Sequence, residues 1–124
     1  MKLRLRENSI RFRLLQSEVK KLAEIGFVEE NIRFSNSQKI TYRVGISKEA
    51  KHICARFEND SIIVAIPERA ARNWIETNLI GLEYEQEATD STNLKITIEK
   101  DFVCLERPKD ADNADAFAHP KMNC

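Results

Sequence analysis

The sequence predicts an α+β fold: a small, mostly β, barrel-like domain built from two tandem strand-strand-helix-strand-strand units with pseudo-two-fold symmetry. Several short segments alternate apolar and polar residues with period two, which is typical of strands with one buried and one wet face. Two other segments change to spacings of three and four, which is typical of short amphipathic helices. The same order of elements occurs twice along the chain, which indicates a repeated unit.

The first unit begins with a predicted hairpin whose turn is Glu7-Asn8. Ser17 is the predicted N-cap of a helix over residues 17–25, because its hydroxyl can accept a hydrogen bond from the first turn. Gly26 is the predicted left-handed end of this helix. The predicted strands of the unit span residues 2–6, 9–14, 27–34 and 39–44.

The second unit repeats this order. Asn59-Asp60 is the predicted hairpin turn, and Pro67 is expected at the first position of the helix, where its missing N–H costs nothing. Asn78 is the predicted left-handed end of that helix. The predicted strands span residues 53–57, 61–66, 79–86 and 94–99, with residues 101–105 extending the last one.

A constant shift of 52 positions, which superposes Ser9 on Ser61, relates the strand, helix and turn positions of the two units. With four residues inserted in the last turn of the second unit, residues 39–41 fall on residues 95–97. We therefore expect a single domain over residues 1–105, with repeat copies at 1–46 and 52–99. Residues 106–124 are expected to form an acidic, loosely ordered tail.

The composition indicates a globular protein of the cytoplasm. The chain has 124 residues, 42% hydrophobic and 32% charged, which is enough to bury one core without disulfides or metal. The longest aliphatic run covers residues 62–66, and the first residues alternate charge with aliphatics, so neither a membrane span nor a secretory signal is expected. Three cysteines at irregular spacing do not resemble a disulfide framework.

The charges are sorted along the chain although the formal net charge is zero. Residues 1–21 carry seven basic and two acidic side chains, whereas residues 82–124 carry five basic and ten acidic ones. We expect the molecule to have a basic end or face and an acidic one, which either attract each other within the molecule or face separate partners.

Residues 60–72 carry a resemblance to a known family. The sequence Asp60-Ser-Ile-Ile-Val-Ala-Ile-Pro-Glu-Arg-Ala-Ala-Arg72 resembles the signature of AbrB-like, swapped-hairpin transition-state regulators and antitoxins, in which a strand ending in proline leads into a short basic helix. The resemblance implies that two fused copies form a single-chain barrel and implies DNA binding. The first copy departs from the pattern with Leu15 at the position of the proline.

A second resemblance spans nearly the whole chain. Residues 2–14, residues 100–105 and the cysteine at position 124 are similar to a family of short bacterial proteins. This resemblance implies a cytoplasmic bacterial protein and brings no known activity with it.

The predicted first hairpin places its basic residues on one face, because its aliphatic residues alternate with them. Arginine offers forked donors to phosphates and carboxylates, so this face could contact nucleic acid or an acidic protein partner. The candidate binding residues are Lys2, Arg4, Arg6, Arg11 and Arg13.

Cys104, His119 and Cys124 are candidate metal ligands, because thiolate and imidazole suit zinc or copper. A full shell would need a fourth ligand, such as His52 or Cys54. No nucleophile with its base, paired acids or glycine-rich phosphate loop is recognisable, so no catalytic residue is predicted. Our first expectation is a non-catalytic regulatory or protein-interaction domain of unknown partner, with a nucleic-acid-binding AbrB-like regulator and a small metal-binding protein as alternatives.

Overall fold

The computed structural model of the chain describes residues 1–102 and 114–118. They form a mostly β fold with two short helices, in the element order that the sequence predicts. The elements are β1 (Lys2–Arg6), β2 (Ser9–Leu14), α1 (Gln16–Ile25), β3 (Phe27–Arg33), β4 (Lys39–Ser47), β5 (Cys54–Glu58), β6 (Ser61–Pro67), α2 (Glu68–Glu76), β7 (Gly81–Thr89) and β8 (Thr92–Lys100).

The strands form two four-stranded sheets. The first sheet has the order β1-β2-β8-β7 and the second has the order β3-β4-β6-β5. Each sheet takes one antiparallel hairpin from the first half of the chain and one from the second. A central parallel pair joins the hairpins, β2 with β8 in the first sheet and β4 with β6 in the second.

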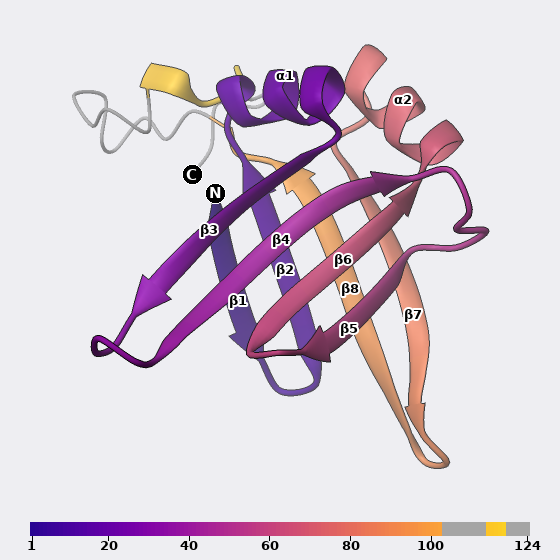
Figure 1. Cartoon of the computed structure of the whole chain (residues 1–124). Helices are drawn as coiled ribbons and strands as arrows, with labels where there is room; N and C mark the ends of the chain where they lie inside the picture. Colours follow the sequence, from indigo (N-terminus) through magenta and orange to yellow (C-terminus); the bar gives the residue numbers. More distant parts are fainter. Residues whose placement is uncertain (103–113, 119–124) are drawn as a thin grey trace.

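The two sheets pack face to face around one core (Figure 1). Strands of the second sheet cross in front of those of the first, and both helices lie at the same end of the molecule. The inner residues of the central strands are buried because alternation directs them between the sheets. The fully buried core side chains include Phe12, Leu14, Leu22, Val44, Val64, Ile66, Trp74, Ile96 and Ile98.

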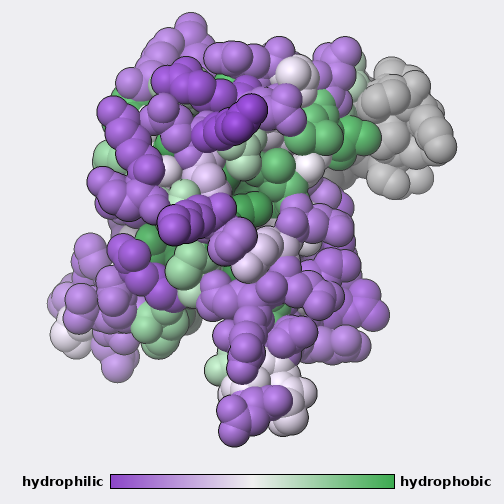
Figure 2. All heavy atoms as spheres, turned by 90° about the vertical axis from the view of Figure 1, so that its right-hand side faces the viewer, coloured by the Kyte–Doolittle hydropathy of each residue, from purple (hydrophilic) through white to green (hydrophobic). Residues whose placement is uncertain are grey.

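The predicted barrel-like domain is not closed into a barrel, since among the described strands no ladder of backbone hydrogen bonds joins one sheet to the other. On the side of β5 and β7 a side chain makes the connection instead. The Gln86 amide donates to the Ala55 carbonyl (2.9 Å) and accepts from the Ala55 N–H (2.8 Å). Close by, the rings of His52 and Tyr84 stack at 5.4 Å. Figure 2 looks onto this side, where hydrophobic residues (green) are visible between hydrophilic ones.

Two of the predicted hairpin turns are confirmed. Glu7-Asn8 connects β1 to β2, with Glu7 at a φ of 52°. Asn59 and Asp60 connect β5 to β6 and both have positive φ, 50° and 57°. Two consecutive positive φ values are typical of the type I′ turn, whose twist suits a two-residue hairpin.

The helix ends agree only in part with the sequence predictions. Gly26 ends α1 at a φ of 101°, as predicted, and its N–H donates to the Leu22 carbonyl. The N-cap is Leu15 rather than Ser17, because the Glu18 carboxylate accepts from the Leu15 N–H and takes over the capping role.

The second helix differs at both ends from the prediction. Pro67 is the last residue of β6 and the N-cap of α2, so the helix begins at Glu68, one position after the expected first helical residue. At the other end Asn78 is not left-handed. The helix ends at Thr77, which has extended backbone and whose hydroxyl donates to the Asn73 carbonyl.

The strand registers revise the alignment of the two halves. Ser9 lies opposite Lys95 in the first sheet, and Ser61 lies opposite Thr41 in the second. Under the shift of 52 positions, which matches Ser9 with Ser61, these registers match Thr41 with Lys95, whereas the sequence alignment matches Thr41 with Thr97. An insertion of two residues instead of four would make that alignment agree with both registers. A period of two conceals such an error, because a two-residue slip leaves every side chain on the same face.

Residues 114–118 contact the start of α1. The Ser17 hydroxyl donates to the Asp115 carboxylate (2.6 Å), and the Gln16 amide donates to the Ala116 carbonyl (2.9 Å). Phe117 pairs in parallel with Phe102 and its N–H donates to the Asp101 carbonyl. Among the described residues, no helix has the length and apolar character that a membrane crossing requires.

Candidate functional site

The outer face of the first sheet, which we call the charged face, gathers the predicted basic residues. In β1 and β2, the residues that alternate with the inward-facing ones point away from the core. The register places Arg4 beside Arg11 and Lys2 beside Arg13. The prediction that β1 and β2 share a basic face is therefore correct in geometry. We call the part of the charged face that β1 and β2 form the basic edge. It consists of Lys2, Arg4, Arg6, Arg11 and Arg13.

Part of the basic edge is neutralised within the molecule. Lys2 forms an ion pair with Asp101 (3.0 Å), and Glu99 on the adjacent strand β8 pairs with Arg13 (2.6 Å) and more distantly with Arg11 (3.9 Å). Arg4 and Arg6 are exposed and form no ion pair with the described part of the chain. In the described part of the chain, the exposed cations of this face without an ion pair are thus Arg4 and Arg6 on β1 and Lys95 on β8.

The opposite edge of the same face is acidic. Glu83, Glu85 and Glu87 alternate along β7 and are exposed, and none forms an ion pair within residues 1–102 and 114–118. We call these three residues the acidic edge. In the sequence, their charge is apparent only as part of the acidic excess over residues 82–124. The signal that could have located them is their period of two, which places three carboxylates on one side of a strand.

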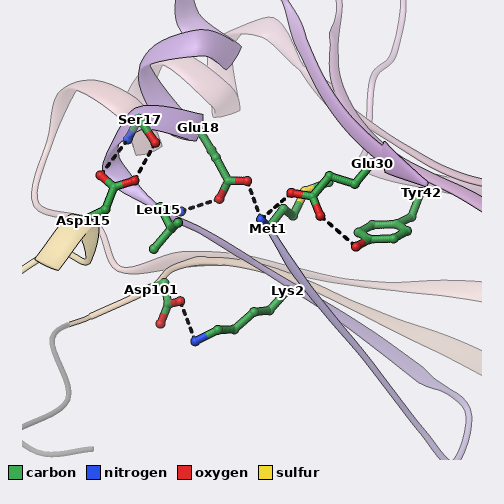
Figure 3. Close-up of polar contacts among 9 residues, drawn as sticks. All are labelled: Met1, Lys2, Leu15, Ser17, Glu18, Glu30, Tyr42, Asp101 and Asp115. Atoms are coloured by element: carbon green, nitrogen blue, oxygen red, sulfur yellow. Dashed lines mark hydrogen bonds and ion pairs between the residues drawn. The ribbon is translucent and has the colours of Figure 1, made fainter. Parts of the chain in front are cut away.

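A polar cavity of about 350 Å³ lies where β1 begins, beside the first turn of α1. Figure 3 shows that its side chains come from α1, β3 and the end of β8 as well as β1. The lining residues are Met1, Lys2, Leu15, Ser17, Glu18, Glu30 and Asp101.

The α-amino group of Met1 is the centre of this cluster. It donates to the carboxylates of Glu18 and Glu30, the latter at 2.7 Å, and Glu30 in turn accepts from the Tyr42 hydroxyl at 2.8 Å (Figure 3). The cluster connects β1, an edge of the first sheet, to β3, an edge of the second. It therefore braces the side of the molecule opposite Gln86.

The pKa values follow from burial and these contacts. Burial by itself lowers the pKa of the Met1 α-amino group, but the bonds and charges of Glu18 and Glu30 outweigh it and raise the pKa above 8.0. Burial acts to raise the pKa of Glu30, yet the Met1 ammonium and the Tyr42 hydroxyl hold it below 4.5. Burial and the Glu30 carboxylate raise the pKa of Tyr42 to about 12. One ammonium held between two carboxylates, one of which also accepts from a tyrosine hydroxyl, suits a structural brace.

Comparison with known proteins places the chain in a family. The sequence profile of a family described as a "family of unknown function (DUF7009)" matches residues 1–121, which include the charged face and the cavity. The chain belongs to the DUF7009 family. No curated protein and no solved structure matches this DUF7009 chain.

The candidate metal ligands of the DUF7009 chain, Cys104, His119 and Cys124, lie outside the described residues. Within residues 1–102 and 114–118 no three His, Cys, Asp or Glu side chains are arranged to hold a metal ion. Cys54, considered as a fourth ligand, is an exposed free thiol on β5, and His52 stacks on Tyr84.

Proposed function

We propose that this chain is a non-catalytic protein-interaction domain that docks its partner on the charged face. The observation that carries the proposal is the sorting of unpaired charge on one exposed sheet face, with Arg4 and Arg6 at one edge and the glutamates of β7 at the other. Opposite charges held apart on a rigid sheet select partners by complementary potential and penalise wrong registers.

The acidic edge favours a protein partner over nucleic acid. A duplex presents phosphates of one sign across its whole width, so a sheet lying on it would bring Glu83, Glu85 and Glu87 against negative charge. Glu99 also neutralises part of the positive charge of Arg11 and Arg13. A protein surface can carry both signs, and one with an acidic and a basic patch side by side would satisfy both edges.

Nucleic-acid binding by an AbrB-like regulator remains our second candidate. The specific observation in its favour is that Arg4 and Arg6 are exposed and unpaired on a strand that forms a sheet edge. Such side chains could neutralise phosphates without any movement of the backbone. This candidate requires a binding mode in which β1 approaches the backbone while β7 stays away from it.

We also infer that the chain arose by duplication of one strand-strand-helix-strand-strand unit, with pseudo-two-fold symmetry between the halves. The sheet orders support this, because replacing every strand by its counterpart in the other half converts β1-β2-β8-β7 into β5-β6-β4-β3, which is the order of the second sheet. Corresponding core positions support it too, since Leu22 and Trp74 are both fully buried, as are Val44 and Ile98. The exchange of hairpins between halves is what the resemblance to swapped-hairpin regulators implies.

Three probes test the docking function by NMR titration of the labelled chain. A glutamate decapeptide should perturb amides of β1 and β2, and a lysine decapeptide should perturb amides of β7. Random-sequence duplex DNA should bind less tightly than the glutamate peptide at roughly physiological salt. Arg4→Glu with Arg6→Glu should remove the response to the glutamate peptide but leave the response to the lysine peptide.

The titrations also distinguish the alternatives. If neither peptide perturbs the charged face, the docking proposal is wrong. If DNA binds at β1 and β2 more tightly than the glutamate peptide, and its affinity falls steeply with salt, the nucleic-acid candidate replaces it.

A further inference from the structure

The charged face is complementary to itself, because its basic and acidic edges lie at opposite edges of the same sheet face. We infer that the partner of this face is a second copy of the chain, bound face to face about a two-fold axis parallel to the strands. This inference rests on the proposed function, since it names the partner of the same surface. Homodimers with two-fold symmetry are the commonest assemblies, and their interfaces must be self-complementary.

The strand register fixes which charges would meet. One row across the face reads Arg4, Arg11, Thr97 and Glu83 from β1 to β7. Rotation about an axis parallel to the strands reverses the strand order and keeps the position along each strand. Arg4 of one copy then lies over Glu83 of the other, and Arg11 lies over Thr97, which is uncharged.

The two neighbouring rows are complementary as well. In one row Arg6 comes to face Glu85 of the second copy, and in the other Arg13 comes to face Glu99. Each of these contacts occurs twice in the dimer because of the symmetry. In the dimer, Arg4 and Arg6 of each copy therefore lie opposite glutamates of the other copy.

The other in-plane orientation is excluded by repulsion. An axis across the strands would preserve the strand order, so that β1 would face β1 and β7 would face β7. Arginines would then oppose arginines and glutamates would oppose glutamates, and like-charge juxtaposition is strongly unfavourable at an interface. The charge pattern therefore selects one orientation of the two copies.

The dimension of the face predicts a weak, salt-sensitive dimer. Four strands about 4.8 Å apart and about six residues long at ~3.4 Å each span roughly 20 × 20 Å. This area is about half of the ~800 Å² that each partner contributes to a standard interface. Exposed ion pairs are screened at high salt, so the dimer should form at about 0.05 M salt and dissociate at about 0.5 M.

Sedimentation velocity of the full chain tests the inference with charge-reversed variants. The wild type should dimerise at protein concentrations up to about 1 mM in low salt. Arg4→Glu with Arg6→Glu makes both edges acidic, and Glu83→Arg with Glu85→Arg makes both basic. Each variant alone should associate at least about tenfold more weakly than the wild type, because both contacts become repulsive.

Mixing the two variants provides the decisive arm. In the mixed pair every acidic edge faces a basic one, so an equimolar mixture should form a heterodimer at low salt under conditions in which each variant alone associates only weakly. Lys39→Glu with Lys48→Glu is the control for Arg4→Glu with Arg6→Glu. It changes the net charge by the same amount as that variant, but at exposed positions outside the charged face. This control should dimerise like the wild type.

Three outcomes would overturn the inference: a wild type that is monomeric throughout, a dimer unaffected by either reversal or by salt, or no heterodimer in the mixture. The peptide titrations are independent of this result. Peptides that bind the charged face of a monomeric chain would leave the docking function in place with a different partner, whereas their failure would remove the docking function itself.

Discussion

Lys100 is a buried cation at the end of β8. Its ammonium donates to the Thr77 carbonyl at the end of α2 (2.7 Å) and lies 5.9 Å from the centre of the Trp74 ring and 5.5 Å from that of Phe117. A cation at a helix C-terminus is favoured by the helix dipole, and aromatic faces attract it. Burial nevertheless lowers the pKa of Lys100 below 10.5, since the charged form is poorly solvated.

Substitutions at Lys100 should separate the contribution of the alkyl chain from that of the charge. Lys100→Met keeps the volume and removes a buried charge, so the free energy of unfolding should change by about 1 kcal/mol or less. Lys100→Glu should cost about 3–5 kcal/mol, because it buries a carboxylate beside a carbonyl at the negative end of a helix.

Urea unfolding monitored by tryptophan fluorescence measures these differences. Lys95→Met, at an exposed position on the same strand, is the control and should stay within about 0.5 kcal/mol of the wild type. A Lys100→Met variant as unstable as Lys100→Glu would contradict this description of the site.

The Met1 cluster predicts a plateau in the pH dependence of stability. The raised pKa of the Met1 α-amino group means that its contribution is complete below pH 8.0 and is lost as pH rises through the folded-state pKa. The lowered pKa of Glu30 means that its contribution is complete above pH 4.5 and is lost as pH falls through the folded-state pKa. Stability should therefore be greatest between these values.

Chemical unfolding at a series of pH values, with Glu30→Gln, tests this linkage. The variant should lose stability at neutral pH and should lose less of the remainder on acidification, since it has no carboxylate to protonate. The pKa of Tyr42 should also fall from about 12 while staying above 10.0, because burial remains. Glu29→Gln, on the opposite face of β3, is the control, and a Tyr42 pKa unchanged in Glu30→Gln would sink the linkage.

Among the elements, the hairpin of β1 and β2 was the most accurately predicted from sequence. β1 and β2 have the predicted bounds, because alternation marks their length and a polar pair marks the turn between them. Helix ends were less accurate, since a cap can come from a residue three positions along the chain, as Glu18 shows. The turn and strand signals are local, whereas capping depends on which of several polar side chains reaches the free backbone groups.

Gln86 substitutes for backbone pairing between the edge strands β5 and β7. Gln86→Leu should leave the N–H and carbonyl of Ala55 without partners in a buried position, at a cost of about 1–3 kcal/mol. Thermal unfolding measures the loss, and hydrogen exchange should show faster exchange of the Ala55 amide. Glu87→Gln, at the next position and exposed, is the control. Unchanged exchange at Ala55 would show that the two strands do not depend on this bridge.

For the molecule as a whole, the exchange of hairpins between halves predicts mutual dependence. Each half of the chain contributes two strands to each of the two sheets, so neither half alone contains a complete sheet. Residues 1–50 and 51–124, produced as separate chains, should not fold as monomers, because each would expose half of the core. Mixing them should restore a one-to-one complex, and residues 1–50 could also pair with themselves if the two halves are duplicates.

Circular dichroism and light scattering of the separate and mixed halves test this dependence. The cut lies between β4 and β5 and interrupts no strand. A half that unfolds cooperatively as a monomer would contradict both the shared core and the inferred duplication.

Local sequence patterns by themselves identify which segments are strands or helices and which of their faces are apolar. They also place the arginines of β1 and β2 on one side of the hairpin. These properties follow from periodicity and turn chemistry, which involve residues a few positions apart. The pairing of β2 with β8 and the position of Glu83 and Glu85 across the sheet from Arg4 and Arg6 came from the fold. They depend on contacts between residues about 80 positions apart, whose choice rests on shared core packing that no local pattern encodes.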